Sequence, residues 1–322
     1  MGSTKPPETP RSARTARTAT WAARREQGSQ LALRLMAWIA TTLGRPVARL
    51  LLHPISVYYL LFASVPRRHS ARYLGRVLGH PPTWRDMYRH IHTFASTVLD
   101  RVYFVRGELQ SFDMQLRGDA GCDETIASGH GGVVLGAHLG SFESLHAAGK
   151  GFPGLRITLV MYPDNARKIQ SVLQAMAPDF KFAMIAIGNA GSALAIREAL
   201  DSGSMVGMLG DRMPATESTR AGTLQIPFLG VPAPFSDGPL RLAMMLKRRV
   251  IFMVGLYQGG RKYDVRFETM ADFRAPPADP AAREAMIHAA LRDYVARLER
   301  LCHEAPYNWF NFYDYWHEDP VH

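Results

Sequence analysis

Short apolar runs alternate with helical stretches over most of this chain, and that alternation limits the possible folds more than any other feature. Strands are expected at residues 133–137, 155–162, 182–187, 205–209, 250–257 and 263–268. Helices are expected from about residue 142 and at residues 70–107, 165–177, 190–202, 238–247 and 280–303. Apolar strands that alternate with helices favour a mainly parallel central sheet flanked by helices, an α/β fold that begins at about residue 110.

The amino-terminal part differs from the rest in composition. Residues 1–30 are rich in Thr, Ala, Pro and Arg, which predicts a disordered basic tail and not a signal peptide. Residues 31–66 are the most apolar stretch, interrupted by Gly44, Arg45 and Pro46. They are expected to form a membrane-associated helical segment that lies in the interface, with a single span or a buried helix pair as alternatives. Residues 67–322 are expected to form the main domain.

Charge and cysteine content narrow the range of partners. The 322-residue chain is 47% hydrophobic and has a net charge of +10, which suits an anionic membrane surface or an acidic protein. No nucleic-acid partner is expected, because the sequence contains no zinc-finger, RNA-recognition or basic-region motif. Cys122 and Cys302 are too far apart in the sequence for a metal or disulfide framework and favour a reducing compartment.

The segment from Gly136 to Glu143 carries the strongest chemical signal. His138 follows a predicted buried strand, and Glu143 lies in the first turn of the helix expected next. A glycine turn at Gly140 would allow the carboxylate to bond one imidazole nitrogen, which leaves the other free to accept a proton. Backbone N–H groups of the turn are candidates for binding an oxyanion. The alternative is a structural histidine at a strand end with a Glu that favours a helix start.

Other catalytic patterns are not present in the sequence. The chain has no Gly-x-Ser-x-Gly nucleophile elbow, so Ser141 is more plausible as a helix cap than as a nucleophile. His90 and His92 would point to different faces of a helix, so neither a metal nor another cofactor is expected.

Four ordered blocks of this sequence resemble a known family. The segment from His138 to Glu143 is similar to the H-x4-(D/E) box of lysophospholipid-type acyltransferases, and more specifically to that of bacterial lipid A late acyltransferases. The blocks at residues 199–212 and 226–233, and the helix and strand expected at 238–255, resemble later segments of the same branch in the same order.

The resemblance implies an acyltransferase domain at residues 67–322. It implies that an acyl group passes from an acyl-carrier-protein thioester to a hydroxyl of a membrane lipid or glycolipid, at the cytoplasmic face of a bacterial inner membrane and without a cofactor. His138 would be the general base and Glu143 its orienting partner. The residues expected to bind substrate are Ser141, Arg167, Asp211, Arg212, Phe228 and Gly230. Arg167 would bind a phosphate or the carrier's phosphopantetheine arm, or else be a solvated helix arginine.

Two departures from the family pattern leave the acceptor open. Arg212 follows Asp211 where lipid A members commonly have Gln, and residues 307–316 are unusually aromatic. Both resemble a subgroup that acylates other lipids, such as aryl-polyene-type lipids. Two other functions compete with acyl transfer. One is a lipid hydrolase or thioesterase that uses the same pair, and the other is a non-catalytic membrane adaptor for an acidic carrier protein.

Overall fold

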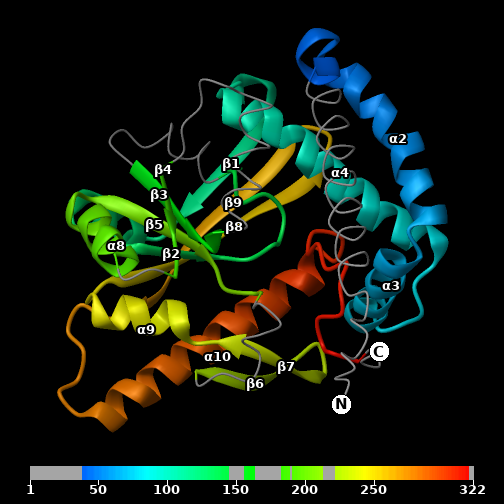
Figure 1. Ribbon diagram of the computed structural model, residues 1–322. Coiled ribbons are helices and arrows are strands. Elements are labelled where there is room, and N and C mark those ends of the chain that lie inside the picture. The colour runs from blue at the N-terminus through cyan, green and yellow to red at the C-terminus, as the bar shows by residue number, and fades with distance from the viewer. Residues whose placement is uncertain (1–37, 145–155, 164–182, 189–190, 213–221, 319–322) are drawn as a thin grey trace, which may run out of the picture.

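The computed structural model describes residues 38–144, 156–163, 183–188, 191–212 and 222–318. Its centre is a seven-stranded sheet in the order β1-β9-β8-β2-β5-β3-β4 (Figure 1). The strands are β1 (Asp113–Gly118), β2 (Val133–Gly136), β3 (Arg156–Met161), β4 (Ala183–Ala186), β5 (Ser204–Leu209), β8 (Arg249–Gly259) and β9 (Lys262–Asp272). All neighbouring strands pair in parallel except β8 and β9, which are antiparallel. The expected mainly parallel α/β fold is confirmed.

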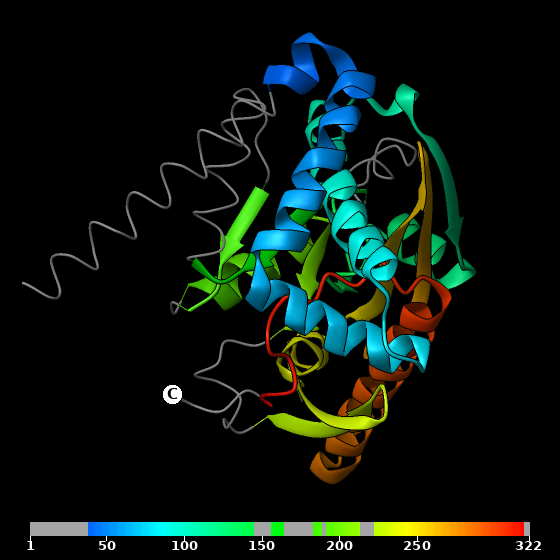
Figure 2. The same ribbon diagram turned by 90° about the vertical axis from the view of Figure 1, so that its right-hand side faces the viewer.

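Helices surround this sheet, and a separate hairpin lies beside it. The helices are α2 (Gly44–Phe62), α3 (Ser64–Leu78), α4 (Trp84–Arg106), α5 (Ala120–Ala127), α8 (Ser192–Asp201), α9 (Gly238–Met245) and α10 (Pro280–Glu304), with a short 3-10 turn, η1 (Leu109–Ser111). Strands β6 (Thr223–Phe228) and β7 (Val231–Ser236) form the hairpin. In Figures 1 and 2, α2 lies along α4 on one side of the molecule.

Alternation along the strands explains why both faces of the sheet are covered. Val133 and Leu135 of β2 belong to the larger core, which includes α10, whereas Val134 belongs to the core around Phe104 of α4 and Cys122 of α5. Successive side chains of a strand point to opposite faces, so each face needs its own layer of helices. The result is a three-layer arrangement that leaves the strand ends accessible for a site.

The expected helical stretch at residues 70–107 is two helices. Gly79 ends α3 in the left-handed conformation, with φ 72°, and two prolines follow it. Thr83 then starts α4 with a capping box, in which its hydroxyl accepts from the Asp86 N–H and the Asp86 carboxylate accepts from the Thr83 N–H. The two helices therefore have separate stop and start signals.

Two other expectations differ from the structure or lie outside it. Residues 223–236, expected as part of a loop, form the β6–β7 hairpin, whose turn residues Leu229 and Gly230 have φ values of 51° and 80°. Positive φ at both central residues is typical of a type I′ hairpin turn. The helix expected at residues 165–177, and most of the one expected from Phe142, lie outside the described residues.

The segment expected to associate with a membrane is helical where it is described. No single helix among the described residues is long and apolar enough to cross a bilayer, although α2 and α3 together pass that test and meet at a bend of 93°. Helix α2 packs on α4 through Ala48 and Leu52, against Leu99 and Val102. Arg45 of α2 also forms a buried ion pair with Asp100 at 2.8 Å.

Candidate active site

The candidate site lies at the carboxyl ends of two adjacent parallel strands. His138 follows β2 and Asp211 follows β5, and the last residues of these strands, Gly136 and Leu209, are paired in register. The N–H of Gly210 continues the ladder by donating to Gly136 O at 3.0 Å. The chain thus brings two residues that are 73 positions apart to one edge of the sheet, where ligands bind in open α/β folds.

Asp211 bonds both the ring and the backbone of His138. The Nδ1 atom of His138 lies 2.9 Å from Oδ1 of Asp211, and the His138 N–H donates to Oδ2 at 3.0 Å. Since a carboxylate only accepts, the neutral imidazole carries its proton on Nδ1 and has its lone pair on Nε2. The His138 side chain is 33% exposed, so solvent or substrate can reach the imidazole.

The Asp211 side chain is fully buried and is held in its charged form. Burial alone would raise its pKa, but the positive charges of His138 in its protonated form and of Arg212, and hydrogen bonds from His138 and Trp309, outweigh burial and lower the pKa to about 2. A buried carboxylate that stays ionised stabilises positive charge on the neighbouring imidazole. The arrangement therefore equips His138 to act as a general base.

No family model matches this chain, and a search of the curated proteins finds no match either.

The prediction that Glu143 bonds the His138 ring is wrong, because Asp211 is the carboxylate that holds Nδ1 of the imidazole. Glu143 instead forms an ion pair with Arg101 of α4 at 2.7 Å and accepts a hydrogen bond from the Ser141 hydroxyl at 3.2 Å. Ser141, expected among the substrate-binding residues, is only 1% exposed, and its hydroxyl is bonded to Glu143. The short spacing between His138 and Glu143 suggested a contact, but the carboxylate of a distant residue takes that place.

The turn after His138 is fixed by a very close backbone approach. Gly140 has φ 69°, and a Cβ there would lie 2.0 Å from Gly255 O, so only glycine fits. The N–H of Ser141 donates to Gly255 O at 2.8 Å, and the N–H of Gly140 donates to Asn308 O at 2.8 Å. These two N–H groups, which the sequence suggested for an oxyanion, already have acceptors within the protein.

The carboxyl-terminal segment completes the site. The N–H of Phe310 donates to His138 O at 3.0 Å, and the Trp309 indole donates to Asp211 Oδ2 at 3.0 Å. Arg212 donates to Phe310 O at 2.7 Å and stacks on the Tyr313 ring at 5.1 Å. The aromatic composition of residues 307–316 distinguishes this segment in the sequence, but no local pattern indicates that it reaches His138.

The other residues expected at the site have different positions. Phe228 is fully buried and packs on Trp309, with ring centroids 5.2 Å apart. Gly230 lies at the exposed turn of the β6–β7 hairpin. Arg167 lies outside the described residues. Of the expected set, the structure brings Asp211 and Arg212 into the surroundings of His138 directly and Phe228 only through Trp309.

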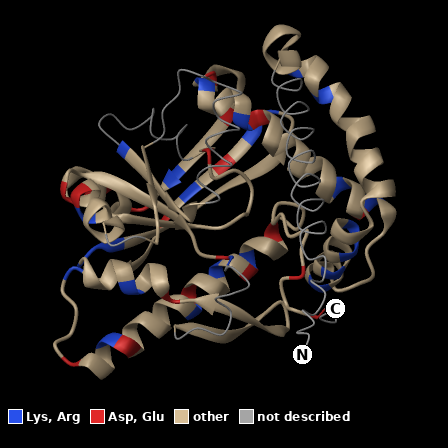
Figure 3. Cartoon of the chain, in the orientation of Figure 1, with Lys and Arg blue, Asp and Glu red and all other residues tan. Residues whose placement is uncertain are grey.

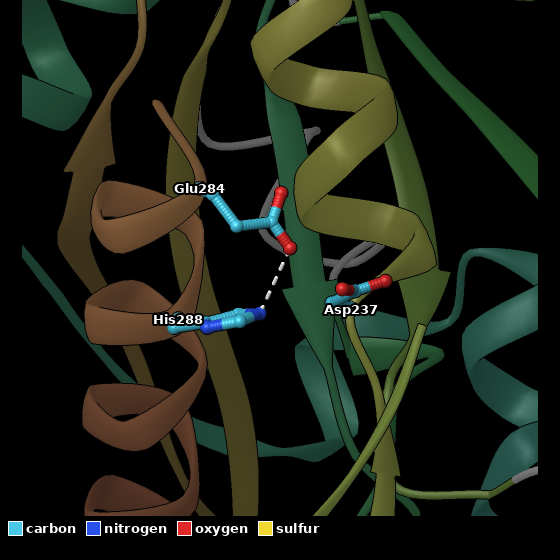
Figure 4. A group of neighbouring side chains, drawn as sticks. All are labelled: Asp237, Glu284 and His288. Carbon is cyan, nitrogen blue, oxygen red and sulfur yellow. Dashed lines mark ion pairs between the residues drawn. The ribbon is translucent and has the colours of Figure 1, made fainter. Parts of the chain in front are cut away.

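A second cluster of polar side chains, Asp237, Glu284 and His288, has the spacing of a metal site, with ligand atoms within 4.8 Å of one another. Figure 4 shows the ion pair between Glu284 and His288, with Asp237 facing them from the start of α9. Arg241, however, already pairs with both carboxylates, at 2.7 Å from Asp237 Oδ2 and 2.7 Å from Glu284 Oε2. The Arg241 guanidinium supplies the positive charge that these two carboxylates need. The resulting ion pairs join α9 to α10.

Proposed function

We propose that this protein is an acyltransferase that moves a fatty acyl group from an acyl-carrier-protein thioester to a hydroxyl of a membrane lipid or glycolipid. The observation that carries the proposal is the His138–Asp211 pair at the carboxyl edge of the sheet, 2.9 Å apart, with Nε2 as the basic nitrogen. The resemblance of the His138–Glu143 segment to the acyltransferase box supports the same reaction class.

The proposed reaction needs one base and no covalent enzyme intermediate. The acceptor hydroxyl oxygen attacks the thioester carbonyl carbon while its proton moves to Nε2 of His138. Asp211 stabilises the imidazolium that forms. The tetrahedral intermediate then expels the carrier's thiolate, which takes the proton from His138, so the base is restored for the next cycle.

The outer face of α2 supports a membrane-bound acceptor. Its large apolar side chains are exposed in a helical stripe, with Leu50 at 68% and Phe62 at 71% exposure, whereas Arg45 and Arg49 turn inward to bond Asp100 and Tyr257. A helix in water normally turns its charged side chains outward. The reversed arrangement suits a surface that rests in the headgroup region of a bilayer, with α2 as an interfacial helix.

The charges of α2 and α3 suit an anionic surface or an acidic donor. Neither helix contains Asp or Glu (Figure 3). Of their six arginines, Arg45 is paired with the buried Asp100, Arg72 with Asp314 and Arg76 with Glu318, so the basic surface depends on the others. Arg68 is exposed, and Arg67 stacks on the exposed Trp84, 5.3 Å from its ring centroid. Basic and aromatic side chains next to an apolar stripe are typical of protein surfaces at the cytoplasmic leaflet.

Product analysis tests the reaction itself. The purified protein is incubated with a labelled acyl-carrier-protein donor and lipid extract, and the products are separated by mass spectrometry. An acylated lipid that is absent with H138Q supports the proposal. Free fatty acid without acylated lipid would support hydrolysis instead. An unchanged donor, with the wild-type protein bound to it, would favour the adaptor function and overturn the proposed one.

A further inference from the structure

Trp309 contacts the candidate site through a single polar atom. Its indole Nε1 donates to Asp211 Oδ2 at 3.0 Å, and the same oxygen accepts the backbone N–H of His138 at 3.0 Å. The other oxygen, Oδ1, faces Nδ1 of His138 at 2.9 Å. With two donors on Oδ2, the plane of the carboxylate is fixed, and Oδ1 is held towards the imidazole.

The backbone on both sides of Trp309 is bonded to the loop that carries His138. Asn308 O accepts from Gly140 N–H, and Phe310 N–H donates to His138 O, so the two segments form a short antiparallel bridge. Asn308 also uses its side-chain amide to bond both backbone groups of Tyr257 in β8, at 2.8 and 3.2 Å. The position of Trp309 is therefore set by the same bonds that set the position of His138.

A buried histidine of α4 holds the Trp309 carbonyl. His90 Nε2 lies 2.9 Å from Trp309 O, and Nδ1 lies 2.8 Å from the hydroxyl of Ser70. A carbonyl only accepts, so Nε2 carries the proton of the neutral ring and Nδ1 accepts from Ser70. Burial lowers the pKa of His90 to about 4, more than the bond to the Trp309 carbonyl raises it, so this ring is neutral near pH 7.

The indole ring is also packed on several sides. Its centroid lies 4.9 Å from that of Tyr73, 5.2 Å from that of Phe228 and 5.0 Å from that of Tyr315. Trp309 is only 1% exposed. A side chain packed in this way cannot rotate its N–H away from Asp211 without moving its neighbours.

We propose that Trp309 is a positioning residue, which keeps the Asp211 carboxylate aligned on His138 through its indole N–H. The expected effect of Trp309 on catalysis rests on the proposed acyl transfer, whereas the hydrogen bond from Trp309 to Asp211 does not depend on that proposal. The carboxyl-terminal segment is therefore part of the site and not only a cover on the core. Removal of the indole donor would leave the carboxylate free to turn and the imidazole less well oriented.

The chain offers a matched pair of substitutions for the test. Trp316 belongs to the same aromatic cluster, and its Nε1 is buried with no hydrogen-bond partner among the described residues. W309F and W316F both replace an indole by a phenyl ring, but only W309F removes a donor to Asp211. We expect kcat for transfer to fall roughly ten-fold or more in W309F, with KM little changed, and to stay within about two-fold of wild type in W316F. Equal kcat values in the two variants would overturn the proposal.

A second measurement does not depend on activity or on the folding of W309F. In ¹⁵N-labelled protein, the Trp309 indole signal, assigned from side-chain connectivity, should shift in D211N but not in E143Q. It should also shift in H138Q, because the partner of the Asp211 carboxylate changes. An indole signal that is insensitive to both D211N and H138Q would overturn the proposed contact. Absence of transfer by the wild type, with this coupling present, would count against the proposed function and not against the role of Trp309 in positioning.

Discussion

His138 Nδ1 and Asp211 Oδ1 lie 2.9 Å apart although 73 residues separate them in the chain. The contact exists because β2 and β5 are neighbours in the sheet and both end at the same edge. Glu143, only five residues from His138, pairs with Arg101 instead. The two carboxylates therefore have different roles, which substitution can separate.

Exchange of each carboxylate for an amide distinguishes these roles. D211N removes the charge that orients and stabilises the imidazole, so we expect kcat for acyl transfer to fall by roughly 10²- to 10⁴-fold. E143Q keeps the His138–Asp211 bond, and we expect a loss of less than about ten-fold, since an ion pair between partly exposed groups contributes little. Steady-state kinetics of both purified variants provides the comparison. A larger loss in E143Q than in D211N would contradict the assignment of Asp211.

The pH dependence of stability follows from the lowered pKa of Asp211. Its folded-state pKa of about 2 lies below the ordinary value of 3.8, so its charge stabilises the fold above pH 4 or so. This stabilisation is lost as the pH falls towards 2. We expect the difference in unfolding free energy between wild type and D211N, from urea titrations, to shrink between pH 6 and pH 3. A difference that stays constant over this range would contradict the charged, buried state of Asp211.

Gly140 offers a test of the loop that carries His138. G140A adds the strain of a left-handed alanine and a clash with Gly255 O, where the new Cβ would lie 2.0 Å away. We expect the free energy of unfolding, measured by urea titration, to fall by roughly 2–5 kcal/mol, and acyl transfer to be lost. Gly129 is the control, because its φ of 67° is nearly the same and a Cβ would meet nothing within 4 Å. G129A should lower the free energy of unfolding by about 1–2 kcal/mol. An equal loss in G140A and G129A would show that the close approach of Gly140 to Gly255 O is not important.

The exposed face of α2 gives a prediction for lipid binding. The double variant L50D/F62D places charges on this face, at side chains that are 68% and 71% exposed. We expect binding to vesicles that contain anionic phospholipid, measured by co-sedimentation, to weaken at least ten-fold, because burial of each such side chain contributes about 1.5–3 kcal/mol. L194D/M245D is the matched control, with side chains 59% and 65% exposed on α8 and α9. Equal loss in both variants would contradict a specific docking face.

Much of the architecture follows from patterns that can be read along the chain. Periodicity depends on local spacing, and it predicted the strands of the sheet from β2 to β9, including the strand that ends just before His138. It did not predict the β6–β7 hairpin or β1, because their short strands carry proline or mostly exposed side chains. It also identified His138 as the candidate base, since the residue type and its position at a strand end can both be read from the sequence.

The groups that surround that base are brought together by contacts between distant parts of the chain. Asp211 comes from the next strand of the sheet, and Trp309 comes from a segment that follows the last helix. Strand order depends on how the crossovers pack, and the path of the carboxyl-terminal segment depends on the aromatic cluster that it completes. Strand order and the path of this segment both depend on long-range packing, which spacing along the chain does not encode. Closeness in sequence therefore favoured Glu143, whereas closeness in space selected Asp211.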